Sequence, residues 1–274
     1  MDLQLSGRTV FITGASGGIG RALARTFADE GCNLALHANS NLDWLRDFVN
    51  GQSWKDRALA VQADITDAAA IQRAMDEATA RFGRVDVCVA NAGKWPKPDE
   101  LLSDMPVERF ADTVAVNLLG AAYTARAFMR QLTTRGASLT FIGSTAGRFG
   151  EAMHSDYSAA KAGLTGLVRS LKNEIVRLDP FARVNMVEPG WTVTEMARDA
   201  LNQPGKITHI AKTSALRQLG RAVDIARAVA MLSSPAVSRH ITGEVITVAG
   251  GMEGRTLWAP EDIDEDAIRN RVKE

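Results

Sequence analysis

The sequence lacks the features that mark several classes of protein. Its 32 basic and 32 acidic side chains cancel, so no net field attracts it to nucleic acid or to an anionic membrane. No apolar run approaches the roughly 20 residues that a membrane-spanning helix needs. The first residues, MDLQLSGRTVFITG, have no basic start, and Thr13 and Gly14 interrupt their short apolar run, so we expect no secretory signal. We therefore expect a cytoplasmic protein that binds neither nucleic acid nor membrane.

Cysteine is also scarce in this sequence. The two cysteines, Cys32 and Cys88, lie in or beside apolar segments and form no CxxC pair. This placement favours free, buried thiols in a reducing compartment over a disulfide or a metal site. We predict no metal centre.

The chain does contain a regular alternation of short β-rich runs with longer helical patterns. Continuous apolar character in the β-rich runs is typical of a parallel sheet covered on both faces. Strands are predicted over residues 8–13, 33–38, 57–62, 85–90, 138–143, 183–188 and 244–249, and helices over 18–29, 67–82, 107–133, 157–178 and 222–232. Asp67 is the expected N-cap of its helix. The alternation predicts an α/β fold, a doubly wound, Rossmann-type parallel sheet of seven strands in one domain over residues 1–251.

Two segments depart from the alternation. Residues 192–217 follow the turn at Pro189-Gly190 and include Gln-Pro-Gly at 203–205, so we predict a partly helical, mobile insertion that covers a site. The tail, residues 252–274, contains Trp258 and a charged helical stretch. It is expected either to dock on its own fold or a neighbouring chain, or to fray in solvent.

A glycine-rich turn, TGASGGIG at 13–20, directly follows the first predicted strand and opens the first helix. Gly14 permits a tight turn, Gly18 lets a phosphate approach the backbone, and Gly20 lets the helix pack closely on the strand. The helix N-terminus then offers unpaired N–H groups and a partial positive charge to a pyrophosphate. This context predicts a dinucleotide site rather than a turn without a ligand.

The end of the second strand lacks an acid. Its residues are His-Ala-Asn-Ser at 37–40, whereas recognition of NAD uses a carboxylate on the ribose 2′-hydroxyl. A carboxylate about 4 Å from a 2′-phosphate would cost roughly 4 kcal/mol per unit charge, and Asn39 and Ser40 can instead donate hydrogen bonds. No basic residue follows the strand, and Gly17 supplies none from the turn. NADP(H) is therefore favoured and NAD(H) remains possible, with His37 either assisting a phosphate or solvated.

Tyr157 and Lys161 are four residues apart in SDYSAAKAG, 155–163, among small side chains. This spacing places both on one helix face, although such pairs also occur by chance. A phenol with a pKa of about 10 is a poor acid–base catalyst at neutral pH. An ammonium about 4 Å away supplies roughly 4 kcal/mol, or about three pKa units. We therefore expect Lys161 to lower the pKa of Tyr157.

Other polar residues follow predicted strands or interrupt a helix. Ser144 ends the fifth strand, and Asn91-Ala92-Gly93 follows the fourth, at the edge of an open sheet where ligands bind. Asn117 lies within a helical pattern, although asparagine is a poor helix former. These residues are candidates to lie beside Tyr157.

Together these motifs resemble the short-chain dehydrogenase/reductase family. They are TGASGGIG, Asp64 after the third strand, Asn-Ala-Gly at 91–93, Asn117, Ser144, YSAAK at 157–161 and PGWTVT at 189–194, in family order from residue 8 to about residue 251. The stretch 38–40 resembles NADP-dependent 3-oxoacyl-carrier-protein reductases. The chain departs from the pattern at Gly17, where such relatives often carry a basic residue, and in Val-Ala-Gly-Gly at 248–251, where an acid commonly precedes the glycines.

The resemblance implies an NAD(P)-dependent oxidoreductase in which the cofactor supplies the hydride. It implies a catalytic set in which Tyr157 is the general acid or base, Lys161 lowers its pKa and binds the nicotinamide ribose, Ser144 orients the substrate oxygen and Asn117 holds a relay water. It further implies that Asp64 and Ile65 contact adenine and that Thr194 contacts the carboxamide. The predicted cofactor contacts are Gly14, Ser16, Gly18, Ile19, Gly20, Ala38, Asn39, Ser40, Asp64, Ile65, Asn91, Ala92, Gly93, Tyr157, Lys161, Pro189, Gly190, Thr192 and Thr194.

Five residues on loops near these motifs are candidates to line a substrate pocket. They are Trp95, Met153, His154, Trp191 and Met196. Two tryptophans and two methionines favour an apolar or aromatic carbonyl over a sugar, although ordinary packing explains each residue as well. For His154 a solvated loop position is favoured over a second acid.

The favoured function is the NADPH-dependent reduction of a ketone or aldehyde with Tyr157 as general acid. The alternatives are alcohol oxidation at the same site, a non-catalytic NADP(H) sensor, and an epimerase or dehydratase, which would usually need a larger substrate domain. The helices predicted at 107–133 and 157–178 carry small residues that allow close helix contacts, and relatives commonly pair these helices, so we predict a homotetramer. The small residues are Ala121, Ala122, Ala125, Gly163 and Gly166.

Overall fold

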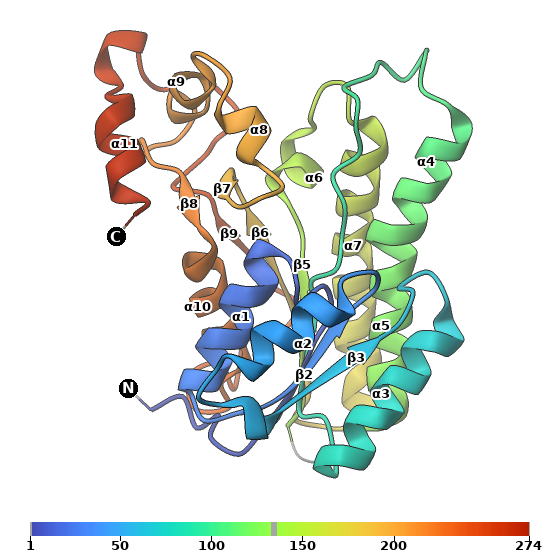
Figure 1. The fold of residues 1–274 in the computed structure, drawn as a ribbon. Coiled ribbons are helices and arrows are strands. Elements are labelled where there is room, and N and C mark those ends of the chain that lie inside the picture. The colour runs from blue at the N-terminus through green and yellow to red at the C-terminus, as the bar shows by residue number, and fades with distance from the viewer. Residues whose placement is uncertain (1, 133–135, 274) are drawn as a thin grey trace.

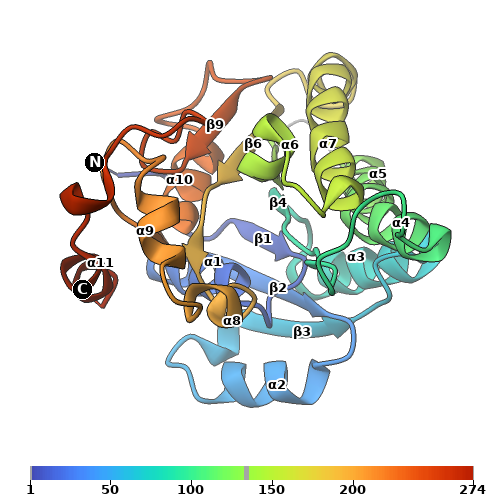
Figure 2. The same ribbon diagram turned by 90° about the horizontal axis from the view of Figure 1, so that it is seen from above.

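A computed structural model describes residues 2–132 and 136–273. Its centre is a parallel seven-stranded sheet with helices on both faces (Figures 1 and 2), in the strand order β3-β2-β1-β4-β5-β6-β9. The predicted doubly wound sheet in one domain is therefore confirmed. The strands are β1 (Thr9–Ile12), β2 (Asn33–Ala38), β3 (Ala58–Gln62), β4 (Val87–Ala90), β5 (Ser138–Ile142), β6 (Arg183–Pro189) and β9 (Val245–Val248).

The continuous apolar character of the strands has a direct cause in the packing. In β1, Val10 and Ile12 belong to the core under α1 and α10, whereas Phe11 belongs to the core on the opposite face. All three side chains are fully buried, so in β1 no position alternates with a solvated one. One face is covered by α1 (Gly18–Asp29), α2 (Leu42–Asn50) and α10 (Ala222–Ser233), and the other by α3 (Ala68–Phe82), α5 (Gly120–Arg130) and α7 (Ser155–Glu174).

A local signal explains the start of α3. The Asp67 carboxylate accepts hydrogen bonds from the backbone N–H groups of Ala69 and Ala70, at 2.8 and 3.1 Å, and so caps α3 as expected. The helix predicted over 107–133 consists of α4 (Val107–Val114), a π-helical turn (Ala115–Leu119) and α5, and its last residue lies outside the described residues. The nine-residue helix α2 was not predicted. Short helices complete this part: α6 (Thr145–Phe149) and 3-10 turns at Lys55–Arg57 and Ile175–Arg177.

Both cysteines are free and buried, as predicted. Burial raises the pKa of Cys32 to about 12 and raises the pKa of Cys88 as well. Both thiols therefore stay protonated and pack as small apolar groups. Among the described residues, no helix is long and apolar enough to cross a membrane.

Segment 192–217 and the tail form a separate layer above the end of the sheet (Figure 1). The segment contains β7 (Thr192–Val193), α8 (Arg198–Leu201) and α9 (Lys206–Ala211), and β7 pairs with β8 (Gly220–Arg221). The tail, with a 3-10 turn at Pro260–Asp262, ends in α11 (Glu265–Arg271), whose Ile268 packs against Leu201 and Ile207. The Trp258 Nε1–H also donates to the Ser214 carbonyl at 2.9 Å. The tail therefore docks on its own fold, which is one of the alternatives expected from the sequence.

The small residues that suggested helix pairing are only partly available for it. Ala121 and Ala125 are buried in the core of their own chain. A Cβ added to Gly163 would lie 2.9 Å from a Leu118 methyl group, so this glycine serves an internal helix contact. Gly166 is exposed, with open space at its Cβ position. The interpretation of the small residues as an intersubunit surface was therefore wrong for Ala121, Ala125 and Gly163.

Candidate active site

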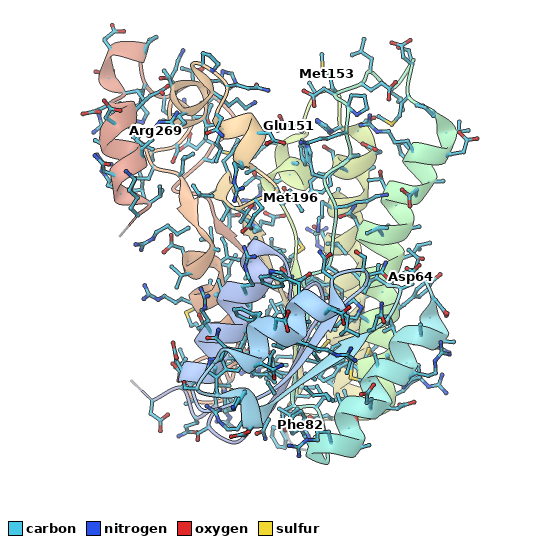
Figure 3. The ribbon with its side chains drawn as sticks, viewed as in Figure 1. Asp64, Phe82, Glu151, Met153, Met196 and Arg269 are labelled. Atoms are coloured by element: carbon cyan, nitrogen blue, oxygen red, sulfur yellow. The ribbon has the colours of Figure 1, made fainter. Side chains whose placement is uncertain are left out.

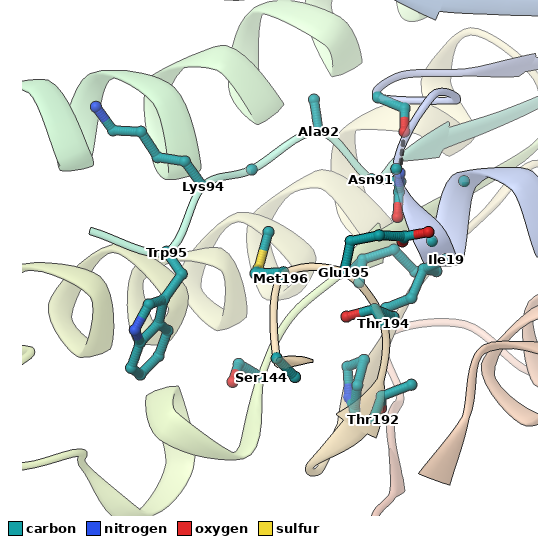
Figure 4. Close-up of a pocket in the computed structure, with 18 of the residues that line it drawn as sticks. Ile19, Asn91, Ala92, Lys94, Trp95, Ser144, Thr192, Thr194, Glu195 and Met196 are labelled. Carbon is teal, nitrogen blue, oxygen red and sulfur yellow. Dashed lines mark hydrogen bonds between the residues drawn. The ribbon is translucent and has the colours of Figure 1, made fainter. Parts of the chain in front are cut away.

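A cavity of about 640 Å³ opens at the carboxyl edge of the sheet (Figure 4). It lies at the point where the strand order reverses between β1 and β4, which is where ligands bind in open α/β sheets. Its volume suits a small-molecule ligand. The lining contains these predicted residues: Gly14, Ser16, Gly18, Ile19, Gly20, Asn91, Ala92, Gly93, Trp95, Ser144, Tyr157, Lys161, Pro189, Gly190, Trp191, Thr192, Thr194 and Met196.

The glycine turn between β1 and α1 has no room for side chains at its tight points. Gly14 has φ +64°, a conformation that favours glycine. A Cβ at Gly20 would lie 2.2 Å from the Gly14 carbonyl oxygen. A Cβ at Gly18 would lie 2.8 Å from the Thr194 side chain on the opposite wall. No side chain of the turn itself covers the backbone at the N-terminus of α1, which lines the cavity opposite Thr194 and Glu195, and this arrangement fits the pyrophosphate of a dinucleotide.

His37 fixes this turn from beneath. The Gly14 N–H donates to His37 Nδ1 at 3.2 Å, so the proton of the neutral ring is on Nε2, which donates to the Ala63 carbonyl at 2.9 Å. Burial lowers the pKa of His37 and keeps the ring neutral. The sequence interpretation of this residue as a phosphate contact or a solvated side chain was wrong, because both ring nitrogens are used to join β2, β3 and the turn.

Asn91 holds the turn from the neighbouring strand. Its side-chain N–H groups donate to the carbonyl oxygens of Thr13 and Gly14, at 2.8 and 3.1 Å (Figure 4). The Thr13 hydroxyl oxygen accepts from the backbone N–H groups of Asn91 and Ala92, both at 3.0 Å. The ends of β1 and β4 are thus locked together at the point where the cavity begins.

Tyr157 and Lys161 project from α7 into the cavity, and each is less than a tenth exposed. Burial raises the pKa of Tyr157 to about 12, although a hydrogen bond with the Ser144 side chain acts to lower it. Burial also lowers the pKa of Lys161 to about 8. The Lys161 Nζ lies 5.7 Å from the Tyr157 ring centroid and donates to the Ile142 carbonyl at 2.9 Å.

The expectation that Lys161 lowers the pKa of Tyr157 is therefore not met in the structure. The reason is that burial governs both groups, raising the pKa of Tyr157 and lowering that of Lys161. The phenol remains a protonated acid throughout the neutral pH range. A buried, protonated O–H beside a serine hydroxyl is suited to donate a proton to a substrate oxygen.

Asn117 occupies the π-helical turn between α4 and α5 and is fully buried. Its Oδ1 accepts from the Lys94 N–H and its Nδ2 donates to the Lys94 carbonyl, both at 3.1 Å. Its Nδ2 also donates to the Thr113 carbonyl at 3.1 Å. These bonds hold the backbone that follows β4, and Asn117 is not part of the cavity lining among the described residues. A π-helical turn is common at functional sites, which explains an asparagine inside this helical pattern.

The substrate candidates divide into two groups. Trp95, Trp191 and Met196 line the cavity, and the Trp95 ring lies edge-on to Tyr157, with centroids 4.8 Å apart. Met153 is 46% exposed at the outer end of the molecule (Figure 3) and outside the lining. His154 lies behind Trp95, with ring centroids 4.0 Å apart and its Nε2 3.1 Å from Asp99 Oδ1. The expectation of a solvated His154 was wrong, because its ring is buried against Trp95.

The adenosine end of the cavity differs from the prediction. Ala38, Asn39, Ser40, Asp64 and Ile65 are absent from the lining among the described residues. The Asp64 carboxylate accepts hydrogen bonds from the backbone and hydroxyl of Thr66, at 2.8 and 2.7 Å, and Ile65 packs against Gly120.

Residues that sequence reasoning missed line this end instead, among them Gly17, Arg21, Asn41, Trp44 and Glu195. Lys94, also missed, lines the cavity next to Trp95 (Figure 4). Arg21 follows the last glycine of the turn, so its place in the first turn of α1 was a usable signal. Trp44 required the recognition of α2, where apolar residues at 45 and 49 are buried one turn apart.

Known proteins resemble this chain over most of its length. A family model described as enoyl-(acyl carrier protein) reductase matches residues 14–253. The 3-oxoacyl-[acyl-carrier-protein] reductase FabG of Escherichia coli is 36% identical over 253 residues, covering 91% of this chain and 99% of the relative. A short-chain dehydrogenase/reductase structure from Brucella melitensis superposes with a TM-score of 0.85 at 30% identity, covering 92% of this chain and 99% of that one. The chain belongs to the short-chain dehydrogenase/reductase family.

Other members of the family extend the comparison. The L-rhamnose 1-dehydrogenase (NAD(P)(+)) of a Sphingomonas species is 34% identical over 251 residues, covering 90% of this chain and 97% of the relative. A Burkholderia cenocepacia short-chain dehydrogenase solved in complex with NADP has a TM-score of 0.82 at 30% identity, covering 90% of this chain and 98% of that one. This short-chain dehydrogenase/reductase is accordingly an oxidoreductase that acts on CH–OH and C=O groups.

Proposed function

We propose that this short-chain dehydrogenase/reductase reduces a ketone or aldehyde to an alcohol with NADPH, with Tyr157 as the general acid. One observation carries the proposal. The protonated Tyr157 phenol and the glycine turn at the N-terminus of α1 line one and the same cavity. An acid and a dinucleotide cradle in one cavity suit hydride transfer coupled to proton transfer.

The residues of the cavity fit a nicotinamide dinucleotide. The turn at 14–20 would hold the pyrophosphate, and Lys161 and Thr194 would hold the nicotinamide half. When bound, the cofactor supplies the hydride. The protein contributes the positions of these groups, which the bonds from His37 and Asn91 to the turn fix in advance.

The chain's own side chains perform the proton chemistry. Ser144 orients the carbonyl oxygen of the substrate toward the phenol, and Tyr157 donates its proton to that oxygen as the alcohol forms. Because the pKa of Tyr157 is raised to about 12, the phenol is fully protonated at neutral pH. Lys161, still an ammonium at pH 7, then stabilises the phenolate until a proton returns from solvent. Trp95 covers the phenol edge and limits access of water.

The walls around Tyr157 favour an apolar or aromatic carbonyl as substrate. The indole rings of Trp95 and Trp191 and the side chain of Met196 provide mainly apolar surface at this end. A planar carbonyl substrate would stack on such surface at low cost in desolvation, whereas a polyol would leave hydroxyl groups unpaired.

The direct experiment follows nicotinamide absorbance with NADPH and with NADH over a panel of ketones and aldehydes. We expect turnover with NADPH that falls by about 10²–10⁴-fold in Tyr157→Phe, the range for loss of a general acid. Tyr123→Phe, which changes the other tyrosine of the chain and lies outside the cavity, is the matched control. Turnover with NADH alone would refute the cofactor assignment, and unchanged turnover in Tyr157→Phe would refute the mechanism.

The reverse reaction is a second candidate. The resemblance to an L-rhamnose 1-dehydrogenase favours testing sugars and other alcohols with NADP⁺ and NAD⁺. Turnover on alcohols with none on carbonyls would replace the reductive assignment. Tight NADPH binding without turnover on either panel would leave the non-catalytic sensor.

Three further proposals concern the whole chain. We propose that residues 192–217 cover bound substrate, since Thr194 and Met196 lie on the cavity wall. We propose a homotetramer in the cytoplasm, with the exposed face of α7 around Gly166 as one contact. Light scattering after gel filtration tests the assembly, and a monomer at micromolar concentration would refute it.

A further inference from the structure

An ion pair joins the two sides of the cavity at its adenosine end. Arg21 lies in the first turn of α1, and Glu195 follows Thr194 in segment 192–217, and both line the cavity. The two side chains are 23% and 50% exposed, so solvent and a ligand can reach them. Burial is the largest influence on Glu195 and opposes its ionisation, but the hydrogen bond from Arg21, a backbone hydrogen bond and the charges of Arg21 and Arg198 together outweigh it, so the pKa of this carboxyl lies below its usual range.

The Glu195 carboxylate lies beside the anion-binding part of the glycine turn. Its Oε2 is 3.1 Å from the position that a Cβ on Gly18 would take. The α1 helix has 12 residues, no acid in its first turn and no side-chain cap, so its N-terminal charge is not neutralised from within the helix. Glu195 therefore provides, from another segment, the negative charge that this helix terminus favours.

Arg21 has a second set of neighbours on the opposite side. Its guanidinium lies over the Trp44 ring, 5.2 Å from the centroid, and Asn41 lines the same part of the cavity. Asn41 follows the end of β2, where a dinucleotide fold recognises the 2′ position of the adenosine ribose. The positive charge that is missing from residues 37–41 and from Gly17 is thus supplied by α1.

We propose that Arg21 is the residue that selects NADP(H) over NAD(H), and that Glu195 is the anion that Arg21 exchanges for the 2′-phosphate. A phosphate monoester carries more negative charge than a carboxylate and accepts bidentate bonds from a guanidinium, so the exchange favours the phosphorylated cofactor. NAD(H) has no 2′-phosphate to replace Glu195 on Arg21. This inference rests on the proposed function for the identity of the cofactor.

Binding is measured by quenching of tryptophan fluorescence with NADPH and NADH, and by calorimetry with 2′,5′-ADP and 5′-AMP. For Arg21→Ala we expect the Kd of NADPH and of 2′,5′-ADP to rise about 10- to 100-fold, as for loss of a charged hydrogen-bonded pair. The Kd of NADH and of 5′-AMP should change less than about twofold. Arg25→Ala is the matched control, because Arg25 lies one turn further along α1, over Phe48 and outside the cavity lining. Arg21→Lys should recover part of the NADPH affinity.

Glu195→Gln tests the exchange itself. Removal of the competing carboxylate should tighten NADPH binding by about threefold or more, and should tighten it more than NADH binding, because NADH presents only the shared pyrophosphate to this region. Asp199→Asn is the control for an effect that arises only because segment 192–217 is held less firmly. Asp199 pairs with Lys97 at 2.8 Å and is outside the cavity lining. The variant breaks a second ion pair of the same segment without changing the charge at the glycine turn, so we expect no tighter binding of NADPH.

Several results would overturn the inference. Equal losses of NADPH and NADH affinity in Arg21→Ala would mean that Arg21 serves the pyrophosphate or the fold. Weaker NADPH binding in Glu195→Gln, or equal tightening in Asp199→Asn, would mean that Glu195 only fixes the segment. These outcomes are read from binding, whereas the proposed function fails on absence of turnover with NADPH bound, so the two failures are distinguishable.

Discussion

The two walls of the cavity are held by different kinds of interaction. The sheet-edge wall, formed by the glycine turn, the backbone after β4 and the start of α7, is fixed by buried and part-buried hydrogen bonds that involve His37, Asn91 and Asn117. The opposite wall, segment 192–217, is joined to the body by the exposed ion pairs Arg21–Glu195 and Lys97–Asp199. Buried polar bonds are costly to break, whereas exposed ion pairs contribute little to stability and exchange partners readily.

This difference separates two tasks within one site. The proposed proton transfer from Tyr157 needs a fixed geometry, which the hydrogen bonds of the sheet-edge wall would provide. The proposed entry and release of a large cofactor would need a wall that opens at low cost, for which the exposed ion pairs of segment 192–217 are suited. Changes to the sheet-edge wall should therefore affect folding and binding together, and changes to segment 192–217 should affect binding with little loss of stability.

The largest effect is expected from Gly20→Ala in the sheet-edge wall. The new Cβ would lie 2.2 Å from the Gly14 carbonyl oxygen, so the turn or α1 must move. We expect a loss of about 1–3 kcal/mol in the free energy of unfolding, as for overpacking, together with loss of NADPH binding. Urea unfolding and fluorescence titration measure the two effects. Gly51→Ala is the control, since its Cβ would make only ordinary contacts. A Gly20→Ala variant with unchanged stability and unchanged NADPH affinity would contradict the conclusion that the turn is fixed.

The next effect concerns His37, which links β2 and β3 to the turn. His37→Ala leaves the Gly14 N–H and the Ala63 carbonyl without this partner, and we expect a loss of about 1–3 kcal/mol. Since burial lowers the pKa of His37, the folded chain binds fewer protons than the unfolded chain as pH falls below about 6.5. The free energy of unfolding should therefore decrease with acidification below that pH. Urea unfolding at pH 7.5 and at pH 5.5 should show that the free energy of unfolding decreases less in His37→Ala than in the parent chain. Equal decreases in the two proteins would exclude His37 as the cause.

The sequence could predict those parts of the site that depend only on the order and spacing of residues along the chain. It could not predict the parts that depend on how distant elements pack together. The sheet, the glycine turn and the residues Ser144, Tyr157 and Lys161 were placed correctly in the cavity because their spacing along strands and helices fixes their position. The role of His37 needed the packing of β2 on β3. The place of Arg21 beside Trp44 needed α2, whose nine residues give too short a pattern to recognise.

A sharper test of the sheet-edge wall is the ionisation of Tyr157. The chain has two tyrosines, so Tyr123→Phe leaves Tyr157 as the sole phenol in an absorbance titration. Because burial raises its pKa to about 12, we expect little tyrosinate in the folded protein at pH 10.5, where an unfolded reference in denaturant is mostly ionised. The folded chain then binds more protons than the unfolded chain, so stability falls as pH rises from about 10 to about 12. Titration near pH 7 would show instead that Lys161 controls the phenol.

The smallest effect is expected where the tail supports the opposite wall. Trp258 donates its indole N–H to the Ser214 carbonyl at 2.9 Å and lies under the Arg217 guanidinium, 4.4 Å from the ring centroid. Trp258→Phe keeps a ring for the cation but removes the hydrogen bond, so we expect a loss of about 0.5–1.5 kcal/mol in the free energy of unfolding. Binding at the glycine turn should be unchanged, because His37 and Asn91 hold that turn independently of the tail. The contacts of Trp258 with Ser214 and Arg217 both lie in segment 192–217. A loss of NADPH affinity as large as that expected for Gly20→Ala would therefore show that the two walls act as a single unit.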